Sequence, residues 1–171
     1  MINEELGWVG FVADIYGPAL HDVKDDFVKM EQAGIYRSDP ALFNSRIQSA
    51  INVLKDHPSV DNSKIAIIGY CLGGTGVLGY SFASAPETTD VVGAVSFHGG
   101  LMDFEVTGEM GSPILVLSGG NDDAGTAVED LEGRLKEADA TWQITRYSGA
   151  YRIVSYRISS PNHIKSSQIK N

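Results

Sequence analysis

Four short apolar runs, separated by polar stretches, and a mixed stretch near the C-terminus predict the strands of a sheet. The runs are four to seven residues long, rich in Val, Ile and Leu, and followed by turn-forming or helical sequence, which favours strands over helices. The run Ile-Ala-Ile-Ile has no polar alternation, as is typical of a strand buried on both faces of a parallel sheet. The apolar runs cover residues 9–13, 65–68, 91–97 and 114–117, and the mixed stretch at 142–147 is the last predicted strand.

Helical periodicity fills the stretches between these runs. The clearest helix begins at Asp39-Pro40, where an acidic N-cap precedes a proline at the first helical position. Apolar residues then recur at spacings of four and three, which predicts one buried face. The stripe consists of Phe43, Ile47, Ile51 and Leu54. Further helices are predicted over 20–34, ending at Gly34, over 72–84 and along a stripe at Val128, Leu131, Leu135 and Ala138.

The order of these elements predicts an α/β fold. Buried strands that alternate with helices favour a mostly parallel sheet with helices on both faces, a three-layer α/β/α sandwich. In such sheets the functional residues follow the carboxyl ends of the strands. The positions to inspect are therefore Asp14, residues 69–71, His98 and residues 119–123.

Composition narrows the classes of partner. The chain has 171 residues, 43% hydrophobic and 20% charged, which fits one globular domain. Its net charge of −9 disfavours nucleic acid and anionic membranes as partners. No apolar stretch reaches 18 residues, and the acidic start does not resemble a signal peptide. A single cysteine excludes an internal disulfide, so we expect a cytoplasmic protein.

Charge is unevenly distributed. Residues 1–151 contain all 22 acidic residues and nine basic residues, a net charge of −13. Residues 152–171 contain four basic residues and no acidic residue, a net charge of +4. This break in composition predicts that the last 20 residues differ in kind from the rest of the chain.

The most informative segment joins a predicted buried strand directly to a helix. It contains Gly69-x-Cys71-x-Gly73, the pattern of a nucleophile elbow with cysteine in place of serine. We expect the flanking glycines to relieve crowding in a strained turn. The helix that follows would favour a thiolate, and the amide of Leu72 would be one oxyanion donor. The alternative is that Cys71 is a buried structural cysteine.

Four segments make the chain resemble the dienelactone hydrolase family, a branch of the α/β-hydrolases with a cysteine nucleophile. They occur in the family's order and lie within roughly residues 7–151, of which the cysteine elbow is the most specific. The segments are Ala-Asp-Ile-Tyr-Gly at 13–17, Gly-Tyr-Cys-Leu-Gly-Gly at 69–74, Ser-Phe-His-Gly-Gly at 96–100 and Leu-Ser-Gly-Gly-Asn-Asp at 117–122. The resemblance implies an incomplete α/β-hydrolase domain over residues 1–151.

The resemblance also implies a Cys-His-Asp triad that hydrolyses esters or lactones. Cys71 matches the nucleophile, and Asp122 matches the acid best, with Asp123 as the near alternative. One of these two carboxylates is also expected to cap the following helix. His98 follows a different strand from the family's catalytic histidine, so we interpret it as lining the pocket or as structural.

The chain departs from the family at both ends. The family's histidine follows the last strand, but Arg152 stands at that position, and arginine stays protonated near neutral pH. His163 is the only histidine in the tail and a weak candidate for the general base. The family's leading strands and the loop with the second oxyanion amide have no counterpart. We therefore expect a truncated, weakly active or inactive hydrolase with a poorly ordered, atypical basic tail at 152–171.

The rival hypothesis is a non-catalytic remnant that acts as a thiol-reactive binding or redox-sensing domain. Under either hypothesis we expect no metal and no organic cofactor. The partner of the hydrolase would be a small ester or lactone. A sheet that lacks its leading strands would also expose an edge, through which two copies could form a homodimer.

Overall fold

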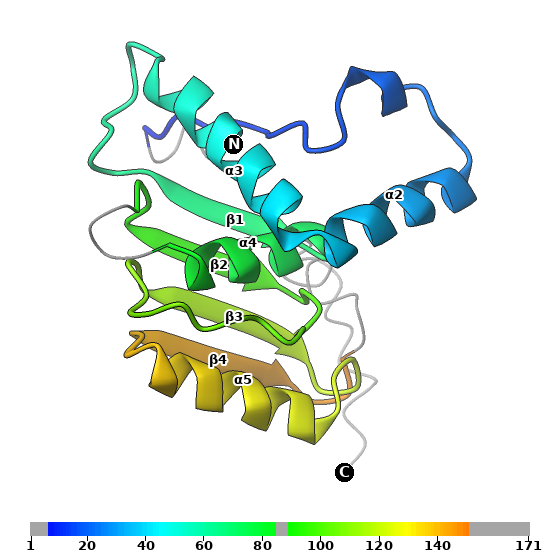
Figure 1. The fold of residues 1–171 in the computed structure, drawn as a ribbon, viewed down its shortest axis with the longest axis vertical. Helices are drawn as coiled ribbons and strands as arrows, with labels where there is room; N and C mark the ends of the chain where they lie inside the picture. The colour runs from blue at the N-terminus through cyan, green and yellow to red at the C-terminus, as the bar shows by residue number, and fades with distance from the viewer. Residues whose placement is uncertain (1–6, 85–88, 151–171) are drawn as a thin grey trace, which may run out of the picture.

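The computed structural model describes residues 7–84 and 89–150, and at their centre lies a four-stranded sheet (Figure 1). The strands are ordered as they occur in the chain, β1-β2-β3-β4, and every neighbouring pair is parallel. Their carboxyl ends therefore meet at one edge, which we call the carboxyl edge. The strands are β1 Ala66–Tyr70, β2 Gly93–Phe97, β3 Ile114–Gly119 and β4 Trp142–Tyr147. The expected parallel α/β sheet is confirmed.

Helices α3, α4 and α5 cover one face of this sheet (Figure 1). Helices α3, α4 and α5 contribute to hydrophobic clusters with side chains from that face, and they form one of the helical layers expected around the sheet. The helical elements are η1 Pro18–Leu20, α2 Asp26–Ser38, α3 Pro40–Lys55, α4 Leu72–Phe82 and α5 Gly125–Glu137. None of the helices in the described residues is long and apolar enough to cross a membrane.

The hydrophobic core lies between the sheet and these helices. Leu78 of α4 and Leu135 of α5 are fully buried. They belong to one cluster with Ala94, Ile114 and Val116, whose side chains alternate along β2 and β3 toward the helices. Burial of each leucine contributes about 2–3 kcal/mol to the free energy of unfolding. The core therefore fixes the sheet and, with it, the loops at the carboxyl edge.

The opposite face of β1 differs from the sequence-based prediction. The run at 65–68 was expected to be buried on both faces, but Ile68 and Tyr70 are 54% and 52% exposed. Among the described residues β1 is an edge strand, and the helices lie against its other face. Tyr70 gains cover from one neighbour, Phe97 of β2, on whose ring it stacks at 4.5 Å.

The prediction of a buried strand at 9–13 is wrong. This segment carries no strand, its residues are exposed, and Val12 is 93% exposed. A strand forms only where a neighbour pairs with its backbone and packs on its side chains. No strand in the described ranges pairs with residues 9–13, so the apolar pattern alone does not produce one.

The predicted helix over 20–34 is also displaced. Helix α2 begins at Asp26, capped by the Asp25 carboxylate, which accepts a hydrogen bond from the Phe27 amide at 2.9 Å. It continues through Gly34 to Ser38. An interior glycine costs a helix only about 1 kcal/mol, which packing of the buried Tyr36 offsets. The predicted start of the next helix is confirmed, because the Asp39 carboxylate accepts from the Leu42 amide at 2.9 Å.

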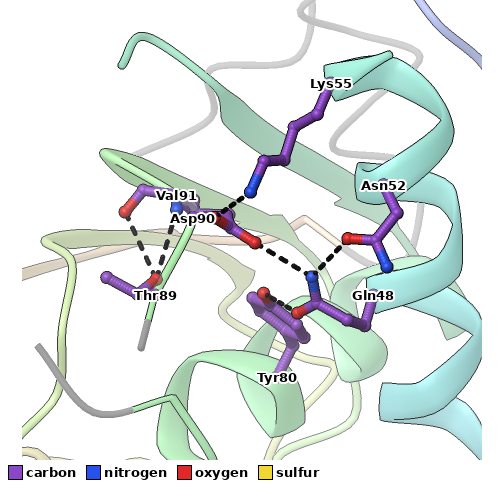
Figure 2. A network of polar contacts seen from close by, with 7 residues as sticks. All are labelled: Gln48, Asn52, Lys55, Tyr80, Thr89, Asp90 and Val91. Carbon is purple, nitrogen blue, oxygen red and sulfur yellow. Dashed lines mark hydrogen bonds and ion pairs between the residues drawn. The ribbon is translucent and has the colours of Figure 1, made fainter. Parts of the chain in front are cut away.

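A polar network secures the other end of the sheet, where β2 begins (Figure 2). Gln48 donates to the carboxylate of Asp90 at 3.0 Å and accepts from the hydroxyl of Tyr80 at 2.7 Å. Gln48 also donates to Asn52 at 3.0 Å, and the Lys55 ammonium lies 2.5 Å from Asp90. These five residues, the amino-end network, join α3, α4 and the segment before β2.

Several expectations fall on residues outside the described ranges. The basic tail at 152–171, with Arg152 and His163, is among them. The boundary expected near residue 151 stays a prediction.

Candidate active site

Backbone hydrogen bonds between neighbouring strands hold the loops of the carboxyl edge. The Cys71 amide, just after β1, donates to the Phe97 carbonyl at 3.0 Å. The His98 amide, just after β2, donates to the Leu117 carbonyl at 2.7 Å. The Gly120 amide, just after β3, donates to the Tyr147 carbonyl at 2.8 Å. The structure thus places Cys71, His98 and the loop at 119–123 along one edge, as the sequence predicts.

Cys71 lies in a strained turn between β1 and α4. Its φ of 53° and ψ of −113° are rare for a residue with a side chain and cost about 1–3 kcal/mol. A Cβ on Gly69 would lie less than 3.0 Å from the backbone of Gly73, so the turn requires glycine there. Gly73 was also expected to relieve crowding in this turn. That prediction is wrong, because an added Cβ there would meet nothing within 4 Å. Crowding in the elbow therefore acts on one of the two flanking glycines.

The thiol is placed at the N-terminus of α4. Cys71 is the N-cap residue, partly exposed, and its side chain makes no capping hydrogen bond. Leu72 is the first helical residue, and the first amides of an α-helix have no acceptor within the helix. An oxyanion beside Cys71 would meet these amides and the positive end of the helix dipole. The structural reading of Cys71 as a buried cysteine does not fit this exposure.

Close contact between α4 and the loop after β2 fixes the position of His98. A Cβ on Gly99 would lie less than 3.0 Å from the backbone of Gly74. The Ser96 hydroxyl donates to the Gly74 carbonyl at 3.0 Å, and the Gly100 amide donates to the Thr75 hydroxyl at 2.8 Å. His98 itself has a φ of 39° and is half-buried. Its backbone is thus part of the frame that supports the elbow.

The two carboxylates after β3 have different surroundings. Asp123 accepts a hydrogen bond from the buried Ser118 hydroxyl at 2.7 Å. Asp122 keeps a buried Oδ2 that has no hydrogen-bond partner among the described residues. The expectation that one of them caps α5 is wrong, because the N-cap is Ala124 and no side chain caps the helix. The Asp123 carboxylate accepts from Ser118 instead of capping the helix.

Arg146 of β4 holds the loop that carries these carboxylates. Its guanidinium donates to the carbonyl oxygens of Gly120 and Asp123 at 3.2 and 3.1 Å. The Asn121 amide donates to the Ala150 carbonyl at 3.1 Å. Sequence reasoning missed Arg146, because a charged residue in an exposed strand gives no signal of which carbonyl groups it will reach.

The turn after β4 brings residue 150 beside the Asp122 carboxylate. A Cβ on Gly119 would lie less than 3.0 Å from both the Asp122 carboxylate and the Ala150 carbonyl. The chain therefore leaves β4 next to the candidate acid. The positions that the resemblance considers for the general base, Arg152 and His163, lie outside the described residues.

The loop before η1 adds a residue that sequence reasoning missed. Tyr16 is 37% exposed, and burial raises the pKa of its phenol, which a Cys71 thiolate and Tyr36 raise further and Arg37 lowers. The Tyr16 ring packs edge-on against the ring of Tyr36, with centroids 5.6 Å apart. The available signal was the Asp-Ile-Tyr-Gly segment, which the resemblance identified without giving its tyrosine a role.

Asp14 shapes this loop. Its carboxylate accepts from the Gly17 amide at 2.9 Å and lies 2.8 Å from Nε2 of His21. The hydrogen bond with His21 is the main cause that holds the pKa of Asp14 below its usual value. Asp14 and His21 thus have a structural role in the turn.

Within the described ranges, no group of three His, Cys, Asp or Glu residues could hold a metal ion.

Solved structures with similar folds are α/β-hydrolases. One is the dienelactone hydrolase-like promiscuous phosphotriesterase P91 from metagenomic libraries, 29% identical, with a TM-score of 0.72 over 81% of this chain and 57% of that chain. A second, m3DLH, is 25% identical, with a TM-score of 0.68 over 77% and 55%. A carboxylesterase from Bacillus cereus, 18% identical, shares the fold with a TM-score of 0.53 over 66% and 54%.

These comparisons bear on the family and on the extent of the chain. The chain spans a little more than half the length of the three solved structures. No curated protein matches it. The profile of the Dienelactone hydrolase family, however, matches residues 3–153, most of the sequence. The chain therefore belongs to the dienelactone hydrolase family, whose relatives of known structure are α/β-hydrolases.

Proposed function

We propose that this protein is a hydrolase of small carboxylic esters or lactones in which Cys71 is the nucleophile. The observation that carries the proposal is the strained backbone of Cys71 at the junction of β1 and α4. A non-glycine residue at positive φ persists only where its surroundings enforce it, and such residues cluster at functional sites. The fixed Gly69 and the partly exposed thiol support the same role.

The reaction proceeds by acyl transfer to sulfur. The Cys71 thiolate attacks the carbonyl carbon, a carbon–sulfur bond forms, and the carbonyl electrons move to oxygen. The Leu72 amide stabilises this oxyanion. Collapse breaks the carbon–oxygen bond, and the alcohol leaves with a proton taken from solvent. Water then adds to the thioester carbonyl, the carbon–sulfur bond breaks, the carboxylic acid leaves with its proton given up to solvent, and the thiolate is restored. A reducing cytoplasm would keep the single thiol available for this chemistry.

Asp122 is the proposed acid of the site. Asp123 already accepts from Ser118, so its carboxylate is occupied by the framework. The buried Oδ2 of Asp122 has no partner within the described ranges and lies against Gly119, as does the Ala150 carbonyl. An imidazole beside this oxygen would donate a hydrogen bond to it. Asp122 would then orient that imidazole and stabilise its positive charge.

The general base limits the activity. Arg152 stands where the family has histidine, and His163 is the remaining weak candidate in the tail. Members of a catalytic triad act as a unit, so the loss of the base removes most of the turnover. We therefore propose that the chain acylates Cys71 and releases the acyl group slowly.

The test is a pre-steady-state assay with excess p-nitrophenyl acetate on the full chain. We expect a burst of about one equivalent of p-nitrophenol, an acetylated Cys71 by mass spectrometry and slow steady release afterwards. The matched variant Cys71→Ser should lose the burst. Arg152→His should raise the steady release by about 10²-fold, because a positioned general base contributes about 10²–10⁴-fold.

Two outcomes oppose this proposal. A burst that survives in Cys71→Ser would place the reaction elsewhere. Rapid alkylation of Cys71 by iodoacetamide without acetylation by the ester would favour the rival, a thiol-reactive binding or redox-sensing domain.

A further inference from the structure

The hydroxyl of Thr75 bridges helix α4 to the loop after β2. It donates to the carbonyl oxygen of Cys71 at 3.3 Å and accepts a hydrogen bond from the amide of Gly100 at 2.8 Å. Thr75 is 3% exposed, so little water reaches this bridge. A hydroxyl has one proton to donate, and the bond from Gly100 polarises it toward the Cys71 carbonyl. Thr75 therefore links the strained turn to the neighbouring loop.

The carbonyl of Cys71 and the amide of Leu72 belong to the same peptide unit. A trans peptide is planar, and its C=O and N–H bonds point in opposite directions. The Cys71 carbonyl points along α4, where it also accepts from the Thr75 amide at 3.1 Å. The Leu72 N–H therefore points the other way, out of the N-terminus of the helix and toward the proposed oxyanion. Any bond that fixes this carbonyl also fixes the direction of that amide.

Backbone strain favours rotation of this peptide unit. The ψ of Cys71, −113°, sets the orientation of the unit relative to the thiol, and the conformation is strained. Rotation that relaxed the strain would turn the Leu72 amide away and break the bonds to the Cys71 carbonyl. The Thr75 amide moves with α4, but the Thr75 hydroxyl is tied to Gly100. Because the Cys71 amide donates to Phe97 at 3.0 Å, the end of β2 and the following loop hold both sides of Cys71.

The bridge made by Thr75 differs from an ordinary hydroxyl contact within a helix. A serine or threonine hydroxyl often bonds to the carbonyl four residues earlier, and such a bond is by itself only structural. Ser84, just beyond the other end of α4, bonds to the Tyr80 carbonyl at 2.7 Å in this way. The Thr75 hydroxyl additionally accepts from an amide of another element, and the carbonyl that it holds belongs to the proposed nucleophile.

We propose that Thr75 is a positioning residue whose hydroxyl holds the Cys71–Leu72 peptide unit so that the Leu72 amide points at the oxyanion. This inference rests on the proposed function and adds a residue that supports its oxyanion donor. Thr75 does not touch the ester, and it gains or loses no bond or proton during the reaction. An amide held in place before the ester binds stabilises the developing negative charge without first having to reorient.

The test measures acylation and alkylation of Cys71 in four full-length proteins: the parent, Thr75→Ser, Thr75→Ala and Ser84→Ala. The two Thr75 variants differ from each other by one oxygen atom. Ser84→Ala removes the comparable hydroxyl at the other end of α4. Acylation by p-nitrophenyl acetate develops an oxyanion, whereas alkylation by iodoacetamide does not.

We expect Thr75→Ala to acylate about 10-fold more slowly than Thr75→Ser. The loss should be smaller than the 10²–10³ for a donor that is removed outright, because the Leu72 amide is still present. Alkylation of the four proteins should agree within about twofold, and Ser84→Ala should acylate like the parent. Thr75→Val lacks the hydroxyl but keeps nearly the size of threonine, so it should acylate as slowly as Thr75→Ala. Urea denaturation verifies that each variant is folded, and Thr75→Val supplies the comparison if Thr75→Ala is not.

Four outcomes overturn the inference. Equal acylation of Thr75→Ser and Thr75→Ala would show that the Leu72 amide keeps its direction without the hydroxyl, and would leave the proposed function standing. An equal loss of acylation and alkylation would assign Thr75 to the reactivity of the thiol. Acylation of Thr75→Val at the rate of Thr75→Ser would assign the effect to packing. If the parent shows no acylation while its thiol alkylates, the proposed function fails and this inference fails with it.

Discussion

The two ends of the sheet differ in whether their polar groups are paired and whether their backbone is strained. At the amino-end network, Gln48 uses both ends of its amide and Asp90 pairs with Lys55, so the polar side chains there have partners (Figure 2). At the carboxyl edge, Cys71 is held at a positive φ and a buried oxygen of Asp122 has no partner in the described ranges. Backbone strain and an unpaired buried oxygen therefore destabilise the carboxyl edge, whereas the polar side chains of the amino-end network are paired.

This difference separates framework from candidate site. Strain and unpaired polar atoms reduce stability, and they persist where a surrounding framework is stable enough to enforce them. Leu78 and Leu135 in the core, together with the amino-end network, provide that framework. Substitutions at the two ends should therefore differ in sign and size.

The largest expected effect is at Gly69. A Cβ in Gly69→Ala would collide with the Gly73 backbone, which cannot move without breaking the elbow or the start of α4. We expect a loss of more than about 4 kcal/mol in the free energy of unfolding, or failure to fold. Urea denaturation followed by circular dichroism measures it.

Gly73→Ala is the matched control on the other side of Cys71. An added Cβ there meets nothing within 4 Å, and Gly73 is helical, so alanine should raise stability by about 0.5–1 kcal/mol. An equal change in the free energy of unfolding for Gly69→Ala and Gly73→Ala would contradict crowding at Gly69 alone.

The next effect is at Gln48 of the amino-end network. Gln48→Ala removes the acceptor of the Tyr80 hydroxyl, and Tyr80 is 4% exposed. A buried hydroxyl without a partner costs about 1–3 kcal/mol, so the free energy of unfolding should fall by that amount. The control is Asn52→Ala at the exposed end of the same network, which should cost less than about 0.5 kcal/mol. If Gln48→Ala and Asn52→Ala lowered the free energy of unfolding equally, the buried hydrogen bond to Tyr80 would add nothing to stability.

The sequence predicted the turn at Cys71 and the start of α3 because both depend on local pattern. Gly69-x-Cys71 sits between an apolar run and a helix, and Asp39-Pro40 starts α3 where an N-cap and a proline require it. The strand expected at 9–13 failed because strand formation depends on a partner that the local pattern does not reveal. Gly34 failed as a helix end because its cost is smaller than the gain from packing Tyr36.

The candidate site was predicted less completely than the fold. Cys71 and the loop at 119–123 meet at the expected edge of the sheet, because parallel strands bring their carboxyl ends together. The choice between Asp122 and Asp123 depends on Ser118, which reaches one carboxylate and not the other. The position of Tyr16 depends on a tertiary row of aromatic rings that it forms with Tyr36 and Phe43. Neither fact has a signature in spacing.

A third prediction compares one carboxylate from each end. Asp122→Asn removes a charge whose buried oxygen has no partner in the described part of the chain, so stability should stay unchanged or rise by up to about 1 kcal/mol. Asp90→Asn removes the partner of Lys55 and should lower stability. Thermal denaturation of both variants at pH 7 shows whether each substitution raises or lowers stability. A clear loss in Asp122→Asn would place Asp122 in the framework instead.

The smallest effect is the acid dependence of the amino-end network. Hydrogen bonds from Lys55 and then Gln48 hold the pKa of Asp90 below its usual value, while partial burial opposes this shift. A depressed carboxyl pKa stabilises the fold above the ordinary value of about 4, and this contribution disappears as pH falls through the lower, folded value. The parent should therefore exceed Asp90→Asn in stability at pH 6 by less than about 1 kcal/mol, the range for a partly exposed ion pair. The difference should shrink between pH 5 and pH 2, as urea midpoints measured across that range would record. A difference that stays constant over the same range would mean that Asp90 acts through packing rather than through its charge.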